Sequence, residues 1–169
     1  LKTGDRIGYN HLVLTNESSM LVEDCQFEYN PTSTIYFSSN LRVIDGSYIH
    51  LFPEEDLINN IAIISNIALN YARDDLSLFS ISLKKKYKKE THESLIRQKL
   101  VHYFGGSKSN YTFEKSFLIN KGTIKQQVGF FDLEKTSHGE YTVCGDYFEN
   151  GSIEGATISG IKAYEQLKK

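Results

Sequence analysis

The chain has 169 residues, of which 40% are hydrophobic and 12% aromatic, enough for one domain or two small lobes with a packed core. A formal net charge of -2 excludes an overall basic field, so nucleic acid is not an expected partner. No uninterrupted apolar run of about 18 residues and no leader pattern occur, so we expect no membrane span and a cytoplasmic protein.

The first half of the chain is rich in strand signals. His11–Leu14 is a continuous apolar run, typical of a strand buried on both faces in a parallel sheet. Ser33–Ser38 and Tyr48–Phe52 combine β-branched and aromatic residues, and the β-branched content of Ile61–Ala68 also favours a strand. In Leu76–Leu83, apolar residues alternate with serines, which predicts a strand with one packed face.

The period changes to three and four residues between Thr91 and Phe104, which predicts an amphipathic helix. Thr91 is the expected N-cap, and Gly105–Gly106 is the expected stop. The preceding basic run, Lys84–Lys89, is interpreted as a solvated turn rather than as a patch for an anionic membrane surface. Strand character returns in Tyr111–Ile119.

The last thirty residues carry the strongest functional signal, with a short buried strand predicted at Tyr141–Cys144. Gly145 and Asp146 follow this strand, and after a polar loop Ser152 is the expected N-cap of a helix. Ligands collect at the carboxyl ends of such strands, where a helix N-terminus offers unpaired N–H groups and partial positive charge. The same pattern would also arise from a strand and a helix that merely pack together. One face of this helix is expected to hold Ile153, Ala156, Gly160, Ile161, Tyr164 and Leu167.

This segment resembles the closing FAD motif of flavin-containing amine oxidases, phytoene desaturases and protoporphyrinogen oxidases. The resemblance rests on Cys144-Gly145-Asp146, on the run 151–156 (Gly-Ser-Ile-Glu-Gly-Ala), and on Ser159-Gly160. It implies FAD as cofactor, with Asp146 at the ribityl and diphosphate region and the helix N-terminus at the pyrimidine edge. There the helix dipole would stabilise negative charge that grows on the flavin as hydride arrives. The implied cofactor-binding residues are Gly145, Asp146, Ser152, Ile153, Glu154, Gly155 and Ala156.

The rest of the chain resembles this family more loosely, at residues 5–18 and at 61–73, the latter including Tyr71-Ala72-Arg73. The expected fold class is α+β: a mixed, mainly antiparallel sheet of substrate-domain type with covering helices. Terminal strand and helix pieces of an FAD-binding α/β lobe would flank this sheet. The expected domains are 1–22 as a piece of the FAD lobe, 23–136 as the substrate-domain sheet, and 137–169 as the C-terminal FAD-binding strand, loop and helix.

None of the glycines forms the G-x-G-x-x-G turn that would hold the diphosphate of FAD. The resemblance therefore implies a fragment of a longer enzyme, whose partners are a small-molecule substrate and a missing N-terminal dinucleotide-binding part of the same protein. We expect the complete protein to remove hydride from an amine or apolar substrate and the fragment alone to be inactive. The alternative is a non-catalytic module that binds a small ligand or a protein partner. No catalytic residue can be assigned.

Other candidate sites are weaker. The five histidines are scattered, so no metal site is expected, and Cys25 and Cys144 are interpreted as buried thiols. Gly151-Ser152-Ile153-Glu154-Gly155 meets the bare pattern of a hydrolase nucleophile elbow, but the predicted strand ends well before Ser152. Several aromatic residues are packed in the core or line an apolar substrate cavity, two alternatives that the sequence leaves open. They are Tyr36, Phe37, Tyr48, Phe52, Tyr103, Phe104, Tyr111 and Phe113.

Overall fold

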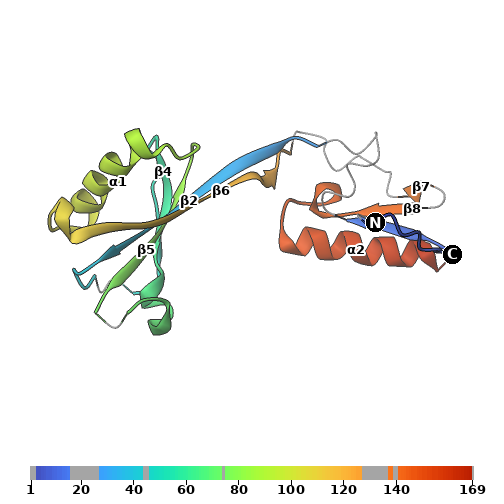
Figure 1. Ribbon diagram of the computed structural model, residues 1–169, viewed down its shortest axis with the longest axis horizontal. Helices are drawn as coiled ribbons and strands as arrows, with labels where there is room; N and C mark the ends of the chain where they lie inside the picture. Colours follow the sequence, from blue (N-terminus) through green and yellow to red (C-terminus); the bar gives the residue numbers. More distant parts are fainter. Residues whose placement is uncertain are drawn as a thin grey trace. The chain divides into compact units, whose positions relative to one another are not determined.

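The computed structural model describes residues 3–15, 27–43, 46–73, 75–126, 137–138 and 141–168 (Figure 1). The chain forms two compact units, of which the first comprises Leu1–Asn30 with Thr123–Lys169 and the second is Pro31–Gly122. The predicted domain boundaries, after residues 22 and 136, lie outside the described residues and stay predictions.

The second unit is built on a five-stranded sheet in the order β3-β4-β5-β2-β6. Strand β5 pairs antiparallel with β2 on one side and with β4 on the other, and β4 pairs antiparallel with β3. The strands are β2 (Tyr29–Ser39), β3 (Ile49–Leu51), β4 (Ile58–Ile63), β5 (Ser77–Leu83) and β6 (Tyr111–Ile124). The strand predictions in this unit are thus confirmed, except at the end of β4.

Helix α1 (Lys89–Phe104) covers one face of this sheet (Figure 1). Its Ile96 and Leu100 are fully buried in one core with Phe37 of β2 and Phe79 of β5. Residues of β5 alternate strictly between buried and half-buried, as the period-2 pattern predicts. The opposite face of the sheet carries the intervening side chains of β2 and β5, such as Tyr36, which lies opposite Ser80.

Two local predictions in this unit are wrong. Helix α1 begins at Lys89 after Lys88, so Thr91 is not its N-cap and instead directs its hydroxyl to the Lys88 carbonyl. Strand β4 ends at Ile63 and a 3-10 turn, η3 (Ile64–Asn66), replaces the rest of the predicted strand.

The physical reason for the early end of β4 lies in two polar side chains. The hydroxyl of Ser65 accepts a hydrogen bond from the Leu78 amide at 3.0 Å. The amide group of Asn66 donates to the Val43 and Gly46 carbonyls, both at 3.1 Å. Such side-chain bonds to backbone groups compete with a strand ladder, and the sequence pattern of apolar residues does not report them. Further 3-10 turns are η4 (Leu69–Tyr71) and η5 (Lys108–Asn110).

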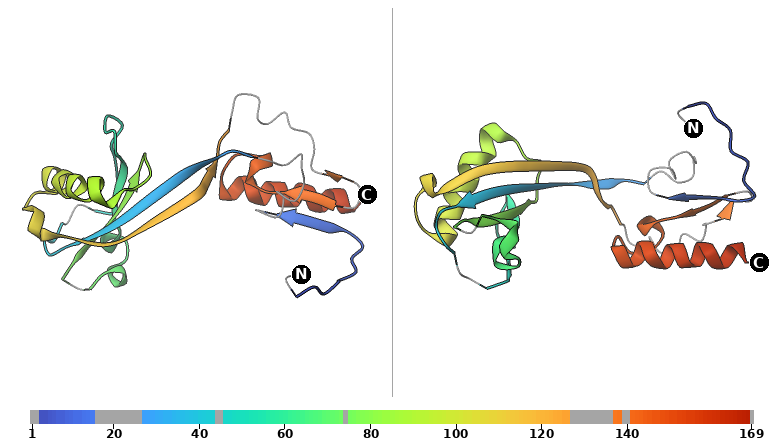
Figure 2. Two further views of the ribbon diagram at one scale, coloured as in Figure 1. Left: turned by 45° about the horizontal axis from the view of Figure 1, so that its top comes forward. Right: turned by 60° about the horizontal axis from the view of Figure 1, so that its bottom comes forward.

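The first unit contains a three-stranded sheet in the order β1-β8-β7. Strand β1 (Leu12–Thr15) runs parallel to β8 (Tyr141–Cys144), which pairs antiparallel with β7 (Ser137–His138). Helix α2 (Ile153–Leu167) packs along β8, as both views in Figure 2 show. A small core in this unit comprises Leu14, Ile124, Val143 and Tyr147, with Phe27 and Phe148 packed against it.

The parallel arrangement of β1 was expected, but its burial on both faces is wrong within the described residues. Leu14 is buried, whereas Val13, which points to the opposite face, is 41% exposed. Leu14 packs in the small core with Val143 and Tyr147, whereas Val13 lies on the other face of β1, outside that core.

The architecture is α+β, with a mainly antiparallel five-stranded sheet, covering helices, and a terminal unit that combines a small mixed sheet with a helix. The fold-class prediction is confirmed. Among the described residues, no helix has both the length and the apolar character needed to cross a membrane.

Helix α1 is tied to the β3–β4 loop by a small polar cluster. The carboxylate of Glu55 accepts hydrogen bonds from the Lys99 ammonium, at 2.6 Å, and from the Tyr103 hydroxyl. The bond from Lys99, followed by that from Tyr103, lowers the pKa of Glu55. Burial, together with the bond to Glu55, raises the pKa of Tyr103 to about 12.

Replacing Tyr103 with phenylalanine (Tyr103→Phe) should lower the free energy of unfolding by about 1 kcal/mol at neutral pH, because the bond to Glu55 is lost. The pKa of Tyr103 rises from 10.0 when unfolded to about 12 when folded. Between these values only the unfolded wild type ionises at this position, so wild-type stability falls as pH rises. The difference between the two proteins should therefore shrink in this window. Urea unfolding of both proteins at a series of pH values measures this difference in stability. A difference that does not change with pH would contradict the hydrogen bond between Tyr103 and Glu55.

Candidate functional site

The candidate site begins where β8 ends. The Gly145 amide donates a hydrogen bond to the Ser159 hydroxyl of α2 at 3.0 Å. This bond links the end of the strand to the helix. The Tyr147 hydroxyl donates to the Cys144 carbonyl at 2.7 Å, and its ring lies where a side chain at Gly145 would be, 2.3 Å from an ideal Cβ. Glycine at position 145 thus makes room for this buried tyrosine.

Helix α2 begins with the predicted cap. The Ser152 hydroxyl accepts the Gly155 amide at 3.0 Å, and the Ser152 carbonyl accepts the Ala156 amide at 3.0 Å. The amides of Ile153 and Glu154, in the first helical turn, have no acceptor within the described chain. The helix therefore presents two free N–H groups and the positive end of its dipole.

Asp146 precedes this helix in sequence and lies on a turn that packs against it, the 3-10 turn η7 (Asp146–Phe148). Its side chain is half-buried and makes no hydrogen bond or ion pair with the described residues. Glu149, by contrast, already holds the Lys162 ammonium. Asp146 and the exposed Glu154 are therefore the acids here whose oxygens remain free to accept hydrogen bonds.

The helix projects beyond the end of the strand. Ser159, which fastens Gly145, lies six residues after Ile153, so the first turns of α2 extend past the strand end by roughly 9 Å at 1.5 Å per residue. The loop residue Asn150 lies against the first turns at Gly155, and Glu149 pairs with Lys162 further along the helix. The predicted cofactor residues therefore all lie on one strand end, one loop and one helix end.

The packing face of α2 differs from the predicted apolar face. Gly155, Ser159 and Ala163 are buried, whereas Ile153 is 90% exposed and Tyr164 is 58% exposed. The reason is the close approach of the loop: an ideal Cβ on Gly155 would lie 2.0 Å from the Asn150 carbonyl oxygen. Small residues face the sheet, and the larger apolar residues form an exposed stripe. We call this set, Ile153, Ile161, Tyr164 and Leu167, the outer stripe of α2.

A second candidate site lies in the other unit, on the sheet face opposite α1. It is a cavity of about 660 Å³, within the range of small-molecule sites, and we call it the sheet cavity. Its lining residues come from β2, β5, β6 and the segment before β5. They are Tyr36, Ser38, Tyr71, Ala72, Arg73, Leu76, Leu78, Glu114, Lys115 and Phe117.

Of the aromatic residues considered from sequence, only Tyr36 lines the sheet cavity. Phe37 and Tyr111 are fully buried in the core beneath α1, and Phe52, Tyr103, Phe104 and Phe113 pack against the same core. Tyr48 is 65% exposed. The sequence reasoning did not select Phe117 for this cavity. Alternation along β2 distinguishes Tyr36 from its buried neighbours, but no pattern in sequence brings Phe117 to the same place.

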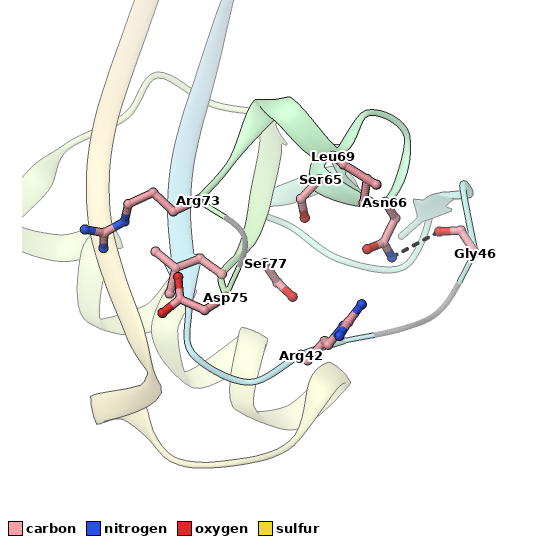
Figure 3. Close-up of a pocket in the computed structure, with 9 residues that line it drawn as sticks. Arg42, Gly46, Ser65, Asn66, Leu69, Arg73, Asp75 and Ser77 are labelled. Atoms are coloured by element: carbon pink, nitrogen blue, oxygen red, sulfur yellow. Dashed lines mark hydrogen bonds between the residues drawn. The ribbon is translucent and has the colours of Figure 1, made fainter.

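A smaller cavity of about 420 Å³ lies beside the sheet cavity and shares Arg73 with it (Figure 3). Its wall includes Ser65, Asn66 and Arg42. In Figure 3 the Arg42 side chain reaches toward Asn66 and Gly46, whereas the Arg73 side chain is directed away from them.

Two weaker candidates carry no chemistry in this structure. Within the described ranges, no group of His, Cys, Asp and Glu side chains could hold a metal ion. Ser152 caps a helix and is separated from β8 by η7, so it is not on the strand-to-helix turn of a nucleophile elbow. Cys144 is buried, which raises the pKa of its thiol, and Cys25 lies outside the described residues.

No protein-family model matches the sequence, and no curated protein matches it with significance. Solved structures are similar in fold. Reduced UDP-galactopyranose mutase superposes with a TM-score of 0.65 at 15% identity, over 98% of this chain and 42% of that one. The PF1083 protein of Pyrococcus furiosus gives 0.59 at 15% identity, over 90% and 35%. An oxidoreductase from Methanosarcina mazei gives 0.56 at 12% identity, over 82% and 35%.

These similarities establish a shared fold. At 12% to 15% identity they carry no statement about individual residues. The chain spans between 35% and 42% of the length of these structures.

The packing of α2 predicts opposite effects for two of its glycines. Gly155→Ala should lower the free energy of unfolding by about 1–3 kcal/mol, because the new methyl group collides with the Asn150 carbonyl. Gly160→Ala meets no atom within 4 Å and should raise it by about 1 kcal/mol, because alanine favours a helix. Urea unfolding of both variants measures this contrast. Equal effects of the two substitutions would show that the described loop does not pack on Gly155.

Proposed function

We propose that this chain is part of an FAD-dependent oxidoreductase of amine oxidase type and supplies the flavin-facing C-terminal motif and the substrate domain. The observation that carries the proposal is the arrangement at the end of β8. There, the free Asp146 carboxylate lies on a turn that packs against α2, and two amides at the N-terminus of this helix lack acceptors. The group that fits such a site has hydroxyls to donate and an edge that becomes negative.

The residues of this chain would hold FAD through two kinds of contact. Asp146, supported by Gly145, would accept hydrogen bonds from ribityl hydroxyls. The amides of Ile153 and Glu154 would donate to the pyrimidine edge, and the Ser152 cap would keep this helix end in place with Gly155 and Ala156. When bound, FAD supplies the acceptor for a hydride. The helix dipole is preorganised to stabilise the negative charge that results.

The structural neighbours support a redox role. One of them is named an oxidoreductase, and another is a mutase described in its reduced form. Because the chain spans less than half of each of these structures, we propose that a longer protein supplies the dinucleotide-binding part absent from these residues. The outer stripe of α2 offers the exposed apolar surface that such a part would cover.

The sheet cavity is the proposed substrate site. Its apolar and aromatic walls would hold an amine or apolar substrate from which hydride is removed. We do not assign a catalytic residue. The second candidate function is a non-catalytic binding module, which the outer stripe of α2 favours, since an exposed apolar helix face also suits a protein partner.

The flavin content of the full-length protein tests the proposal. Asp146→Ala should weaken FAD binding by about tenfold or more, because a charged hydrogen-bond acceptor is lost. Asp56→Ala, at an exposed aspartate in the other unit, serves as the matched control and should leave FAD binding unchanged. Binding is measured from flavin absorbance during dialysis, and circular dichroism confirms that each variant is folded. A folded Asp146→Ala protein that retains FAD like the wild type would contradict the assigned site, and a wild type without flavin would favour the binding module.

A further inference from the structure

We propose that the sheet cavity selects an aromatic or apolar ring system that carries an anionic group, a carboxylate or a phosphate, over a cationic amine. The inference rests on the proposed function, because it takes this cavity as the substrate site of the oxidoreductase. Of the two substrate classes proposed above, an amine or an apolar molecule, the polar groups that line the cavity favour the second, with an acidic group attached.

The walls of the cavity are suited to a flat ring. Tyr36 and Phe117 meet edge to face, with ring centroids 5.9 Å apart and an interplanar angle of 88°. Tyr71 adds a third ring, and its side chain is 58% exposed. The aliphatic side chains of Leu76 and Leu78 complete the apolar surface. Rings in such an arrangement favour another planar apolar group by stacked or edge contacts.

The charges in the cavity are unequal. Two cations, Arg73 and Lys115, line it together with one acid, Glu114. Glu114 accepts a hydrogen bond from the Ser38 hydroxyl, which satisfies part of its acceptor capacity. Arg73 has no ion-pair partner in the part of the chain that the structure describes. A guanidinium without a partner, beside an apolar wall, is suited to bind a carboxylate or phosphate through paired N–H groups.

Aromatic walls can also bind cations, so the rings alone do not exclude an amine. In this cavity, however, the Lys115 ammonium already lies 4.9 Å from the centroid of Phe117. One face of Phe117 is therefore occupied by a protein cation, whose charge would repel a second positive charge that enters the cavity. The same ammonium attracts an anion that enters beside the ring.

The neighbouring cavity provides an internal comparison. Arg42 also has no ion-pair partner among the described residues, but it lines only the smaller cavity, and Figure 3 shows it reaching toward Asn66. Arg73 is directed away from that group and also lines the sheet cavity with Glu114 and Lys115. Arg42 is thus a matched control for Arg73, because it lines the smaller cavity but not the sheet cavity.

The test uses the full-length protein and three probes that share one ring system: 2-naphthoate, 2-naphthyl phosphate and 2-naphthylmethylamine, with acetate as the anion without a ring. Calorimetric titration at neutral pH should show that at least one of the naphthyl anions binds about tenfold or more tightly than the amine, and that acetate does not bind. The stronger of the two anions identifies the carboxylate or the phosphate as the preferred group.

Variants then test which charged residues of the cavity determine the preference for an anion. Arg73→Gln should weaken binding of the preferred anion by about tenfold, because a charge-assisted bond is lost, whereas Arg42→Gln should leave it unchanged. Glu114→Gln should strengthen anion binding and weaken amine binding, since a negative charge is removed. Tighter binding of the amine than of both anions, or equal effects of Arg73→Gln and Arg42→Gln, would overturn the inference.

The flavin content of the same preparations separates this inference from the proposed function. Protein that retains FAD but fails the probe test keeps its proposed function and loses only the substrate class. Protein without FAD fails the proposed function, whatever the probes show.

Discussion

The parallel pairing of β1 with β8 is the constraint on which the first unit depends. Leu12 lies opposite Tyr141 and Thr15 opposite Cys144, so segments from the two ends of the described chain form one small sheet. Parallel strands require a long crossover connection, and here the whole second unit lies in sequence between the two strands. Without β1, the two-residue strand β7 would be the only partner of β8 among the described strands, and α2 would have little sheet on which to pack.

Close packing between α2 and the end of β8 places the candidate cofactor groups. The contact depends on residues without bulk: Gly155 beneath the Asn150 carbonyl, and Ser159, whose hydroxyl holds the Gly145 amide. The large apolar residues of the helix point outward as a result. A helix whose small side chains face its own sheet and whose large side chains are exposed has a second surface for another part of a protein to cover.

In the second unit, one face of the sheet forms the hydrophobic core and the other face forms a cavity. The face beneath α1 is closed by Ile96, Leu100 and Phe79, and its side chains are fully buried. The opposite face carries Tyr36 and Leu78 and forms the sheet cavity with charged side chains from β6 and Arg73. Because strand side chains alternate between faces, a substitution at one position changes either the core or the cavity, which leaves the cavity free to vary in chemistry.

Most of the strands, both helices, the glycine end of α1 and the Ser152 cap of α2 can be predicted from the sequence, because they depend on local periodicity and on backbone bonds within a few residues. The sequence also singled out Asp146 and the helix end that follows. The buried face of α2, in contrast, depends on tertiary contacts, because the approach of Asn150 to Gly155 outweighs the apolar pattern. The same holds for the sheet cavity, where Tyr36, Arg73 and Phe117 come from separate segments. Strand register and chain crossover bring such residues together, and neither leaves a periodic signal in the sequence.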